Sequence, residues 1–320
     1  MNYRSFSEQT KHYFNRQHLR IPSSLLSAPS AWRGDDLRRK PETWTYVLTD
    51  SDIAEIEHAV DSAPTTLADI VRENFALPEL SQRIRGWQHQ LAHGLGLQLI
   101  KGLPVHYGED WVQRAFWGIG HHLGQPGGQN PAQELLGHVK DYAEDDPTVR
   151  LYRTPGDIAF HCDAADVVGL LCLDTAATGG QSRVVSTVTL FNELFQARQD
   201  LLPIVFAEMK LDGRGERPAE ATPYSTVVPC RYDGATLRTF YHSNYMRSVE
   251  RLDGVELTHK QRQTLDFYDS HGNEEALYLE MNLEPGDLQF ISNHTTAHAR
   301  TAYQDGPQQK RHLLRLWLSL

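Results

Sequence analysis

The sequence predicts a mainly β protein, one sandwich or barrel of short strands with helices packed around it. Two observations lead to this fold class. From about residue 125 the chain consists of short apolar segments with turn signals between them, and the clear helical periods lie mostly before that point. We expect an irregular arm over residues 1–48 and a single domain over residues 49–320, with its helices mostly at 50–124.

Composition and charge fit an ordinary globular protein. The 320 residues are 40% apolar and 22% charged, which allows a sizeable core. The formal net charge of −10 argues against a general binder of nucleic acid or anionic membranes, because such proteins need clustered Lys and Arg side chains. We therefore expect a small-molecule partner and no nucleic acid or membrane partner, and we leave a homo-oligomer open.

Cysteine content and hydropathy indicate the compartment. The chain has three cysteines without CxxC spacing, which fits free thiols in a reducing environment. Its first residues lack the apolar core of a signal peptide, and the longest apolar run, residues 167–173, is too short to span a bilayer. These features predict a cytoplasmic protein.

The first part of the chain alternates between irregular and helical patterns. Residues 1–48 are polar and rich in Arg, Ser and Pro. We expect the aromatic residues of this arm to pack against the body and hold the arm in place. Apolar residues at helical spacing predict helices over 50–60, 80–93 and 111–124. The clearest is the second, where Gly94 follows the last apolar position as a stop signal. The alternating segment 97–102 predicts a strand.

The second part predicts strands with two further helices. The expected strands lie at 158–163, 167–173, 183–187, 225–229, 236–241, 277–283, 288–292 and 311–318, and the helices at 190–199 and 258–271. The continuous apolar run 167–173 is typical of a strand buried on both faces. Residues 210–223 are polar and rich in Pro and Gly, which predicts an excursion or lid-like loop.

Two Pro-Gly-Asp turns, at 155–157 and 285–287, each start an apolar segment that leads towards metal-type side chains. The first precedes His161 and Asp163. Residues two apart on a strand point to the same side, so these two side chains would face one space. The second leads towards His298, with His294 as a competing ligand four residues earlier. An HxD pair alone is common by chance and does not define a metal site.

Arg311 and Arg315 lie on one face of the last predicted strand. Two guanidinium groups on an apolar strand are costly to bury unless an anion meets them. Arginine suits two-pronged binding of a carboxylate.

Four motifs together resemble the Fe(II)/2-oxoglutarate-dependent dioxygenases of the taurine dioxygenase and clavaminate synthase type. They are His161-x-Asp163, the turn Gly179-Gly180-Gln181-Ser182, Asn293-xxxx-His298 and Arg311-xxx-Arg315, in that order, and the resemblance runs from about residue 95 to the C-terminus. It implies a double-stranded β-helix, a jelly roll with helices outside.

The resemblance also implies roles for single residues. His161, Asp163 and His298 would bind Fe(II), which fits two histidines and one carboxylate on one side of a non-haem iron. Arg311 and the Ser182 hydroxyl would bind the distal carboxylate of 2-oxoglutarate. Arg315 corresponds to a position that contacts an anionic substrate in some relatives.

Other polar residues carry weaker signals. Arg153 and Asp166 flank the HxD strand, and we expect them either to contact the substrate or to form packing and surface contacts. Arg300 is interpreted as lying behind the ligands or at the surface. His242 has no partner pattern and is interpreted as structural or solvated.

The expected function is an oxygenase that uses Fe(II), 2-oxoglutarate and O2 to hydroxylate a C–H bond of a small carboxylate, an amino-acid-like molecule or a natural-product intermediate. 2-Oxoglutarate would become succinate and CO2. Desaturation, epoxidation or ring closure would use the same residues. Two other hypotheses stay open, a zinc or manganese jelly-roll hydrolase or isomerase, and a non-catalytic binding module.

Overall fold

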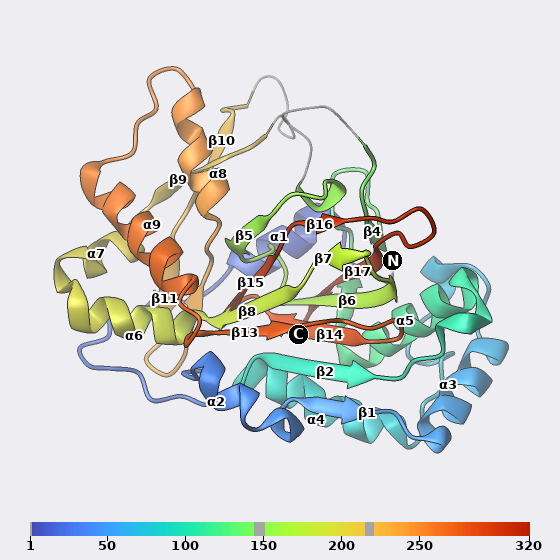
Figure 1. The fold of residues 1–320 in the computed structure, drawn as a ribbon. Coiled ribbons are helices and arrows are strands. Elements are labelled where there is room, and N and C mark those ends of the chain that lie inside the picture. The colour runs from blue at the N-terminus through green and yellow to red at the C-terminus, as the bar shows by residue number, and fades with distance from the viewer. Residues whose placement is uncertain (1, 144–150, 215–220) are drawn as a thin grey trace.

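A computed structural model describes residues 2–143, 151–214 and 221–320 and shows two β-sheets packed face to face, with helices on their outer sides (Figure 1). The major sheet contains β1 (Thr45–Val47), β2 (Leu97–Lys101), β14 (Leu288–Ser292), β6 (Val167–Asp174), β17 (His312–Ser319) and β3 (Gln125–Gly127) in this order, with β4 (Gly137–Val139) also paired to β17. The minor sheet contains β13 (Tyr278–Met281), β8 (Ser182–Ser186), β15 (Thr296–Arg300) and β5 (Ile158–His161).

Neighbouring strands in both sheets come from distant parts of the chain. In the major sheet, β6 lies between β14 and β17 and is antiparallel to both. In the minor sheet, β15 lies between β8 and β5, again antiparallel to both. This interleaving of two antiparallel sheets is the double-stranded β-helix that the sequence predicts.

Three smaller strand pairs form separate two-stranded sheets. They are β9 (Met209–Asp212) with β10 (Tyr224–Val227), β11 (Cys230–Tyr232) with β12 (Leu237–Thr239), and β7 (Thr178–Gly179) with β16 (Tyr303–Gln304). The predicted excursion at 210–223 is thus partly the β9–β10 hairpin. Its lid-like part falls partly on residues 215–220, which lie outside the described residues.

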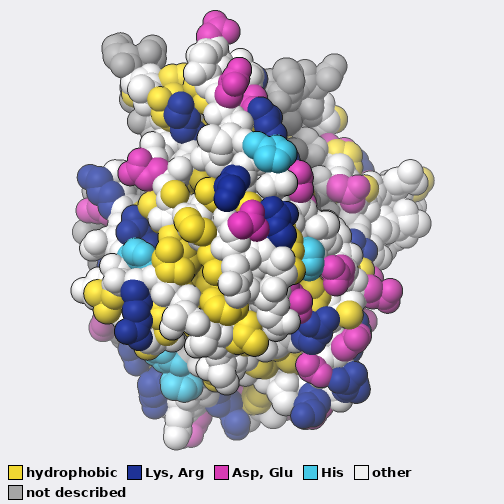
Figure 2. Space-filling model, turned by 90° about the vertical axis from the view of Figure 1, so that its left-hand side faces the viewer, with side chains coloured by type: hydrophobic (Ala, Val, Ile, Leu, Met, Phe, Trp, Pro, Cys, Tyr) yellow, Lys and Arg dark blue, Asp and Glu magenta, His cyan; other side chains and the backbone are white. Residues whose placement is uncertain are grey.

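Helices cover both outer faces (Figure 1). The major sheet is covered by α3 (Asp50–Ser62), α4 (Leu80–His93) and α5 (Glu109–Leu123), and the cluster on the other side includes α6 (Thr187–Ala197), α7 (Leu202–Val205), α8 (Ser243–Arg247) and α9 (His259–Gly272). On the face that carries α6, α7 and α9, hydrophobic side chains gather near the centre with charged side chains around them (Figure 2). Within the described residues, no helix is long and apolar enough to cross a membrane.

The predicted helices form where the apolar period is clear. On α4 the four residues at helical spacing, Leu80, Ile84, Trp87 and Leu91, are all buried, and the helix ends at Gly94. α3 begins at Asp50 as predicted, and Thr49 caps it: the Thr49 side chain accepts a hydrogen bond from the Asp52 N–H, and the Asp52 carboxylate accepts one from the Thr49 N–H.

The central strands confirm the predicted burial on both faces. On β17, Leu314, Leu316 and Leu318 face the helices of the major sheet. Trp317 packs on the opposite face, in the core between the two sheets. This alternation also directs Arg315 towards the space between the sheets.

The N-terminal arm differs from the prediction. It contains α1 (Phe6–Phe14) and α2 (Gly34–Arg38), and β1 joins the major sheet parallel to β2. The helical period of α1 is hidden in the sequence because one of its two buried residues is Gln9, whose amide oxygen accepts a hydrogen bond from Ser319 Oγ at 2.8 Å. The predicted packing of aromatic residues is confirmed for Trp32 and Trp44, which are both buried.

One prediction concerns Phe290 on β14, which is fully buried between Gly169 and the Phe116 ring of α5, 6.0 Å away. Replacing Phe290 by alanine should lower the free energy of unfolding by about 3–5 kcal/mol, because the surrounding side chains cannot close the cavity. Chemical denaturation measures the change. Val47→Ala, at an exposed strand position, is the control and should stay within about 0.5 kcal/mol of the parent. Equal loss for both variants would contradict this placement of the core.

Candidate metal centre

The pairing of β5 with β15 brings two histidines together. In this antiparallel pair His298 lies directly opposite His161, and the centroids of their rings are 4.2 Å apart. Asp163 lies two residues beyond His161, just after the end of β5. One ligand atom from each of the three side chains lies within 4.8 Å of the others. The structure therefore brings together the three residues that the sequence predicts as iron ligands.

Asp163 is held by two contacts to its carboxylate and one to its backbone. Trp317 Nε1 donates a hydrogen bond to its Oδ2 at 3.0 Å, Arg315 Nη1 lies 3.7 Å from the same oxygen, and the Asp163 N–H donates to Asn293 Oδ1. Burial raises the pKa of Asp163, but the positive charge of Arg315, the two histidines and the Trp317 hydrogen bond together lower it to about 2. The side chain is therefore an anion at neutral pH.

The two histidines are neutral. Burial lowers the pKa of His161, and it lowers that of His298 to about 3. His161 Nδ1 lies 2.9 Å from the Ala159 carbonyl oxygen, which can only accept a hydrogen bond. Nδ1 must then carry the proton, and the lone pair of Nε2 is free to bind a metal.

These donors fit a divalent iron ion. Two neutral imidazoles and one carboxylate on one side of a metal are diagnostic of non-haem Fe(II) oxygenases, because the other coordination positions stay open for cosubstrate and O2. His298 Nε2 and Asp163 Oδ2 are 3.9 Å apart, too far for a hydrogen bond and close enough to share one metal.

The centre opens on a cavity of about 500 Å³. One wall is the face of α1 that carries Phe6, Thr10, Lys11 and Phe14, and a second wall comes from the β9–β10 hairpin. Tyr152, His242, Tyr245, Arg315 and Trp317 complete the lining around His161 and Asp163. The arm that we expected to be irregular therefore builds part of the cavity.

Arg315 lies beside the metal centre, as its predicted role requires. Its Nε donates to Gln129 Oε1 at 2.7 Å, and its guanidinium packs over the rings of Tyr152 and Trp317. Nη2 is buried without a hydrogen-bond partner among the described residues. This atom is available to an anionic ligand.

Arg311 lines a different cavity, about 370 Å³, together with Gly179, Gly180 and Gln181. Gly180 has φ +77°, and a Cβ there would come within 3.0 Å of Arg311 Nε, so glycine leaves the room that this side chain occupies. Ser182 is buried nearby on β8, and its hydroxyl donates to Gln289 Oε1 at 3.0 Å. Neither Arg311 nor Ser182 is among the residues that line the cavity at the metal centre.

Asp166 does not line either cavity. Its buried carboxylate lies 2.9 Å from His12 Nε2 and 2.8 Å from His294 Nε2, and it accepts hydrogen bonds from Arg16 and from the Leu320 N–H. Burial raises its pKa, but these partners hold it well below the usual range. Of the two roles expected for Asp166, the structure shows packing and ion-pair contacts and no place in the cavity, and these contacts tie the end of α1 to the C-terminus.

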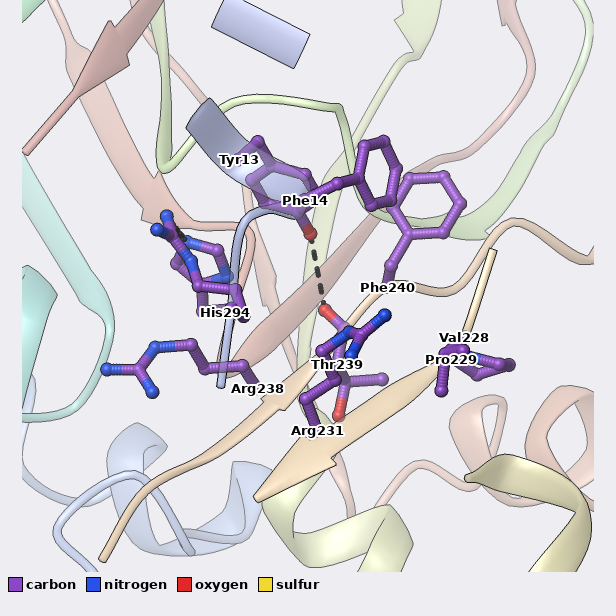
Figure 3. Close-up of a pocket in the computed structure, with 10 residues that line it drawn as sticks. Tyr13, Phe14, Val228, Pro229, Arg231, Arg238, Thr239, Phe240 and His294 are labelled. Atoms are coloured by element: carbon purple, nitrogen blue, oxygen red, sulfur yellow. Dashed lines mark hydrogen bonds between the residues drawn. The ribbon is translucent and has the colours of Figure 1, made fainter. Parts of the chain in front are cut away.

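His294, the competing ligand, belongs to the same anchor. Its ring stacks on Tyr13 of α1 at 4.6 Å, and the Tyr13 hydroxyl donates to the Thr239 and Asn293 carbonyls. Figure 3 shows Tyr13 and Phe14 against Phe240, with the hydrogen bond to Thr239 drawn. His294 is therefore not part of the metal centre.

Arg153 and His242 complete the set of weaker candidates. Arg153 packs over the Tyr142 ring at 3.8 Å and does not line the cavity, which is the packing alternative of its two expected roles. His242, which we interpreted as structural, lies in the cavity with its ring 5.1 Å from that of His161 and stacked on Tyr245. No spacing in the sequence marks His242, because an isolated bridge to His161 brings it there.

A second group of ligand-type side chains occurs among the described residues. Glu109, His138 and His312 lie near one another away from the cavity. His138 Nδ1 and His312 Nε2 are 2.8 Å apart, so a hydrogen bond between the two rings accounts for their approach.

Most of the chain is similar to known proteins of one family. The model of the taurine catabolism dioxygenase TauD, TfdA family matches residues 61–317. FR-33289 synthase of Streptomyces rubellomurinus is 30% identical over 289 residues, which cover 87% of this chain and 85% of the relative. Uridine-5'-phosphate dioxygenase of an Amycolatopsis species is 27% identical over 209 residues, 60% of this chain and 74% of the relative.

Solved structures agree in fold. The asparagine oxygenase complex with Fe(II), 2S,3S-3-hydroxyasparagine and succinate superimposes with a TM-score of 0.70 at 16% identity, over 86% of this chain and 93% of that chain. The non-haem iron oxygenase OrfP with Fe and alpha-ketoglutaric acid gives 0.62 at 14% identity, over the same shares.

A prediction follows for the anchor of α1. Replacing Asp166 by alanine removes the carboxylate that His12, Arg16, His294 and the Leu320 N–H contact. The packing of α1 against the body should therefore become less stable. Hydrogen exchange should become faster across Phe6–Phe14. Asp200→Ala, which removes an exposed ion pair with Arg198, is the control and should leave exchange in α1 unchanged. Slow exchange of α1 in the Asp166 variant would contradict the anchoring role.

Proposed function

The chain belongs to the taurine catabolism dioxygenase TauD, TfdA family, and on this premise we propose that His161, Asp163 and His298 bind Fe(II) and that the adjoining cavity holds a small substrate for hydroxylation. The expected class, an Fe(II)/2-oxoglutarate-dependent dioxygenase, is confirmed by this membership. The observation that carries the residue assignment is the register of β5 and β15, which sets three ligand atoms within 4.8 Å at the wall of the cavity.

The overall reaction balances as substrate, O2 and 2-oxoglutarate giving hydroxylated substrate, succinate and CO2. Bound iron and 2-oxoglutarate supply the oxidising chemistry. The chain holds the metal and orients the C–H bond. Asn293 holds the Asp163 backbone, the Trp317 N–H fixes the Asp163 carboxylate, and Trp317 and Tyr152 pack around Arg315 and limit access of water.

We assign the distal carboxylate of 2-oxoglutarate to Arg311. This guanidinium is only 5% exposed, and its Nη1 has no hydrogen-bond partner among the described residues, which supports an anionic ligand. For Ser182 to take part, its hydroxyl must turn from Gln289 towards the carboxylate.

The substrate that we propose is a small amino-acid-like or other anionic molecule. Lys11 and Arg315 both line the cavity, whereas the Asp212 carboxylate is already bound by Arg251 and Ser248. The similar asparagine oxygenase and OrfP were solved with hydroxyasparagine and hydroxyarginine, and a curated relative is named for uridine-5'-phosphate. Desaturation, epoxidation or ring closure are the alternative outcomes at the same centre.

We further propose a cytoplasmic enzyme in which residues 49–320 form the body of the catalytic domain, while the N-terminal arm adds β1 to the major sheet and α1 to the cavity wall. The three cysteines are free and buried, which fits a reducing compartment. The net charge of −10 supports small-molecule partners over nucleic acid or membranes. A homo-oligomer stays a prediction.

The proposed function is tested with purified protein loaded with Fe(II) without oxygen, then mixed with 2-oxoglutarate, O2 and a panel of amino acids and small anions. Succinate should form together with a product that is one oxygen atom heavier. His298→Ala should abolish both and lower bound iron, because two remaining ligands hold iron poorly. His89→Ala, at an exposed site on α4, is the control and should behave as the parent. Bound zinc and hydrolysis without O2 uptake would instead support the hydrolase hypothesis.

A further inference from the structure

Arg300 and Arg311 meet inside the protein although they come from different sheets. Arg300 is on β15 of the minor sheet, and Arg311 immediately precedes β17 of the major sheet. Both guanidinium carbons lie over the ring of Tyr303, at 4.8 and 5.2 Å from its centroid. Arg300 is 6% exposed and Arg311 is 5% exposed. Two positive charges therefore share one buried site.

The charges of this pair are poorly matched by the protein. Arg300 Nη2 donates to the carbonyls of Thr154 and Gly156, which bear no net charge. Nε and Nη1 of Arg300 and Nη1 of Arg311 are buried with no hydrogen-bond partner among the described residues.

Among the described residues, no acid forms an ion pair with either guanidinium group. Asp141 and Asp157 are near Arg300 without a hydrogen bond to it, and Asp305 accepts a hydrogen bond from the Arg311 backbone N–H and not from its guanidinium. Burying two like charges without a counter-ion is costly, so the site favours an anionic ligand.

The pair lies on a line that starts at the metal centre. Arg300 follows His298 by two residues on β15, so both side chains point to the same face, about 7 Å apart along the strand. Their partners on β8 are Val184 and Ser182, and the Ser182 hydroxyl reaches Gln289 across the gap between the sheets. A short dicarboxylate bound at the metal by one end would extend along this face towards the two guanidinium groups.

We propose that Arg300 is a second cosubstrate-binding residue, which together with Arg311 binds the distal carboxylate of 2-oxoglutarate, with Tyr303 holding both guanidinium planes. This rests on the proposed function. In this proposal Arg300 contacts the 2-oxoglutarate carboxylate directly. The alternative is a structural role, in which Arg300 only holds the turn before β5 through its hydrogen bonds to the Thr154 and Gly156 carbonyls.

The test compares two 2-oxo acids that differ in the distal carboxylate. Binding of 2-oxoglutarate and of 2-oxobutyrate, which lacks that group, is measured by calorimetry on protein loaded with Mn(II), which needs no turnover. Arg300→Gln should weaken 2-oxoglutarate by roughly 10- to 100-fold, the range for loss of a charge-assisted contact, and leave 2-oxobutyrate unchanged. Arg300→Lys should lie between the parent and the Gln variant.

Two further variants separate the possible failures. Arg311→Gln should show the same selective loss, and Arg183→Gln, which breaks a partly exposed pair with Glu280 on the outer face of β8, should change neither affinity. Equal weakening of both 2-oxo acids by Arg300→Gln, or none, would overturn the proposal in favour of the structural role. If Arg300→Gln does not fold, the same comparison on Arg300→Lys decides. Failure of the unmodified protein to bind 2-oxoglutarate would instead overturn the proposed function.

Discussion

The antiparallel register of β5 and β15 is the constraint on which the rest of the site depends. It sets His161 opposite His298, and a shift by one residue would turn one of the two rings to the other face of the sheet. The same register places Asp163 beyond the end of β5, where Asn293, Arg315 and Trp317 can reach it. The pairings of β15 with β8 and of β6 with β17 hold this arrangement from both sheets.

Charge in the space between the sheets is the second constraint. Asp163 and Arg315 lie close together there and largely offset each other, with Gln129 and the rings of Tyr152 and Trp317 completing the surroundings of the guanidinium. Arg300 and Arg311 have no such carboxylate partner among the described residues. The interior therefore has one nearly neutral charged site at the metal centre and one cationic site farther along β15. That asymmetry suits a ligand with a metal-binding end and an anionic end.

The sequence predicted what depends on local pattern. The period of α4, the alternation of β17 and the His161-x-Asp163 spacing follow from residues close together in the chain, and the structure agrees with each. Contacts between distant residues were not predictable in this way. The sequence leaves open whether Asp166 contacts substrate or forms packing contacts, because its partners His12, Arg16 and Leu320 come from both ends of the chain. Arg300 and His242 gain their neighbours only through strand pairing and an isolated bridge.

The central claim is that His161, Asp163 and His298 form one iron site whose open positions accept 2-oxoglutarate. Anaerobic titration of the protein with Fe(II) and 2-oxoglutarate, followed by visible absorption, tests it directly. The account predicts a charge-transfer band that appears only when both are present, saturates at one iron per chain, and is lost in Asp163→Ala. Absence of the band at saturating concentrations, or its persistence in the Asp163 variant, would contradict the account.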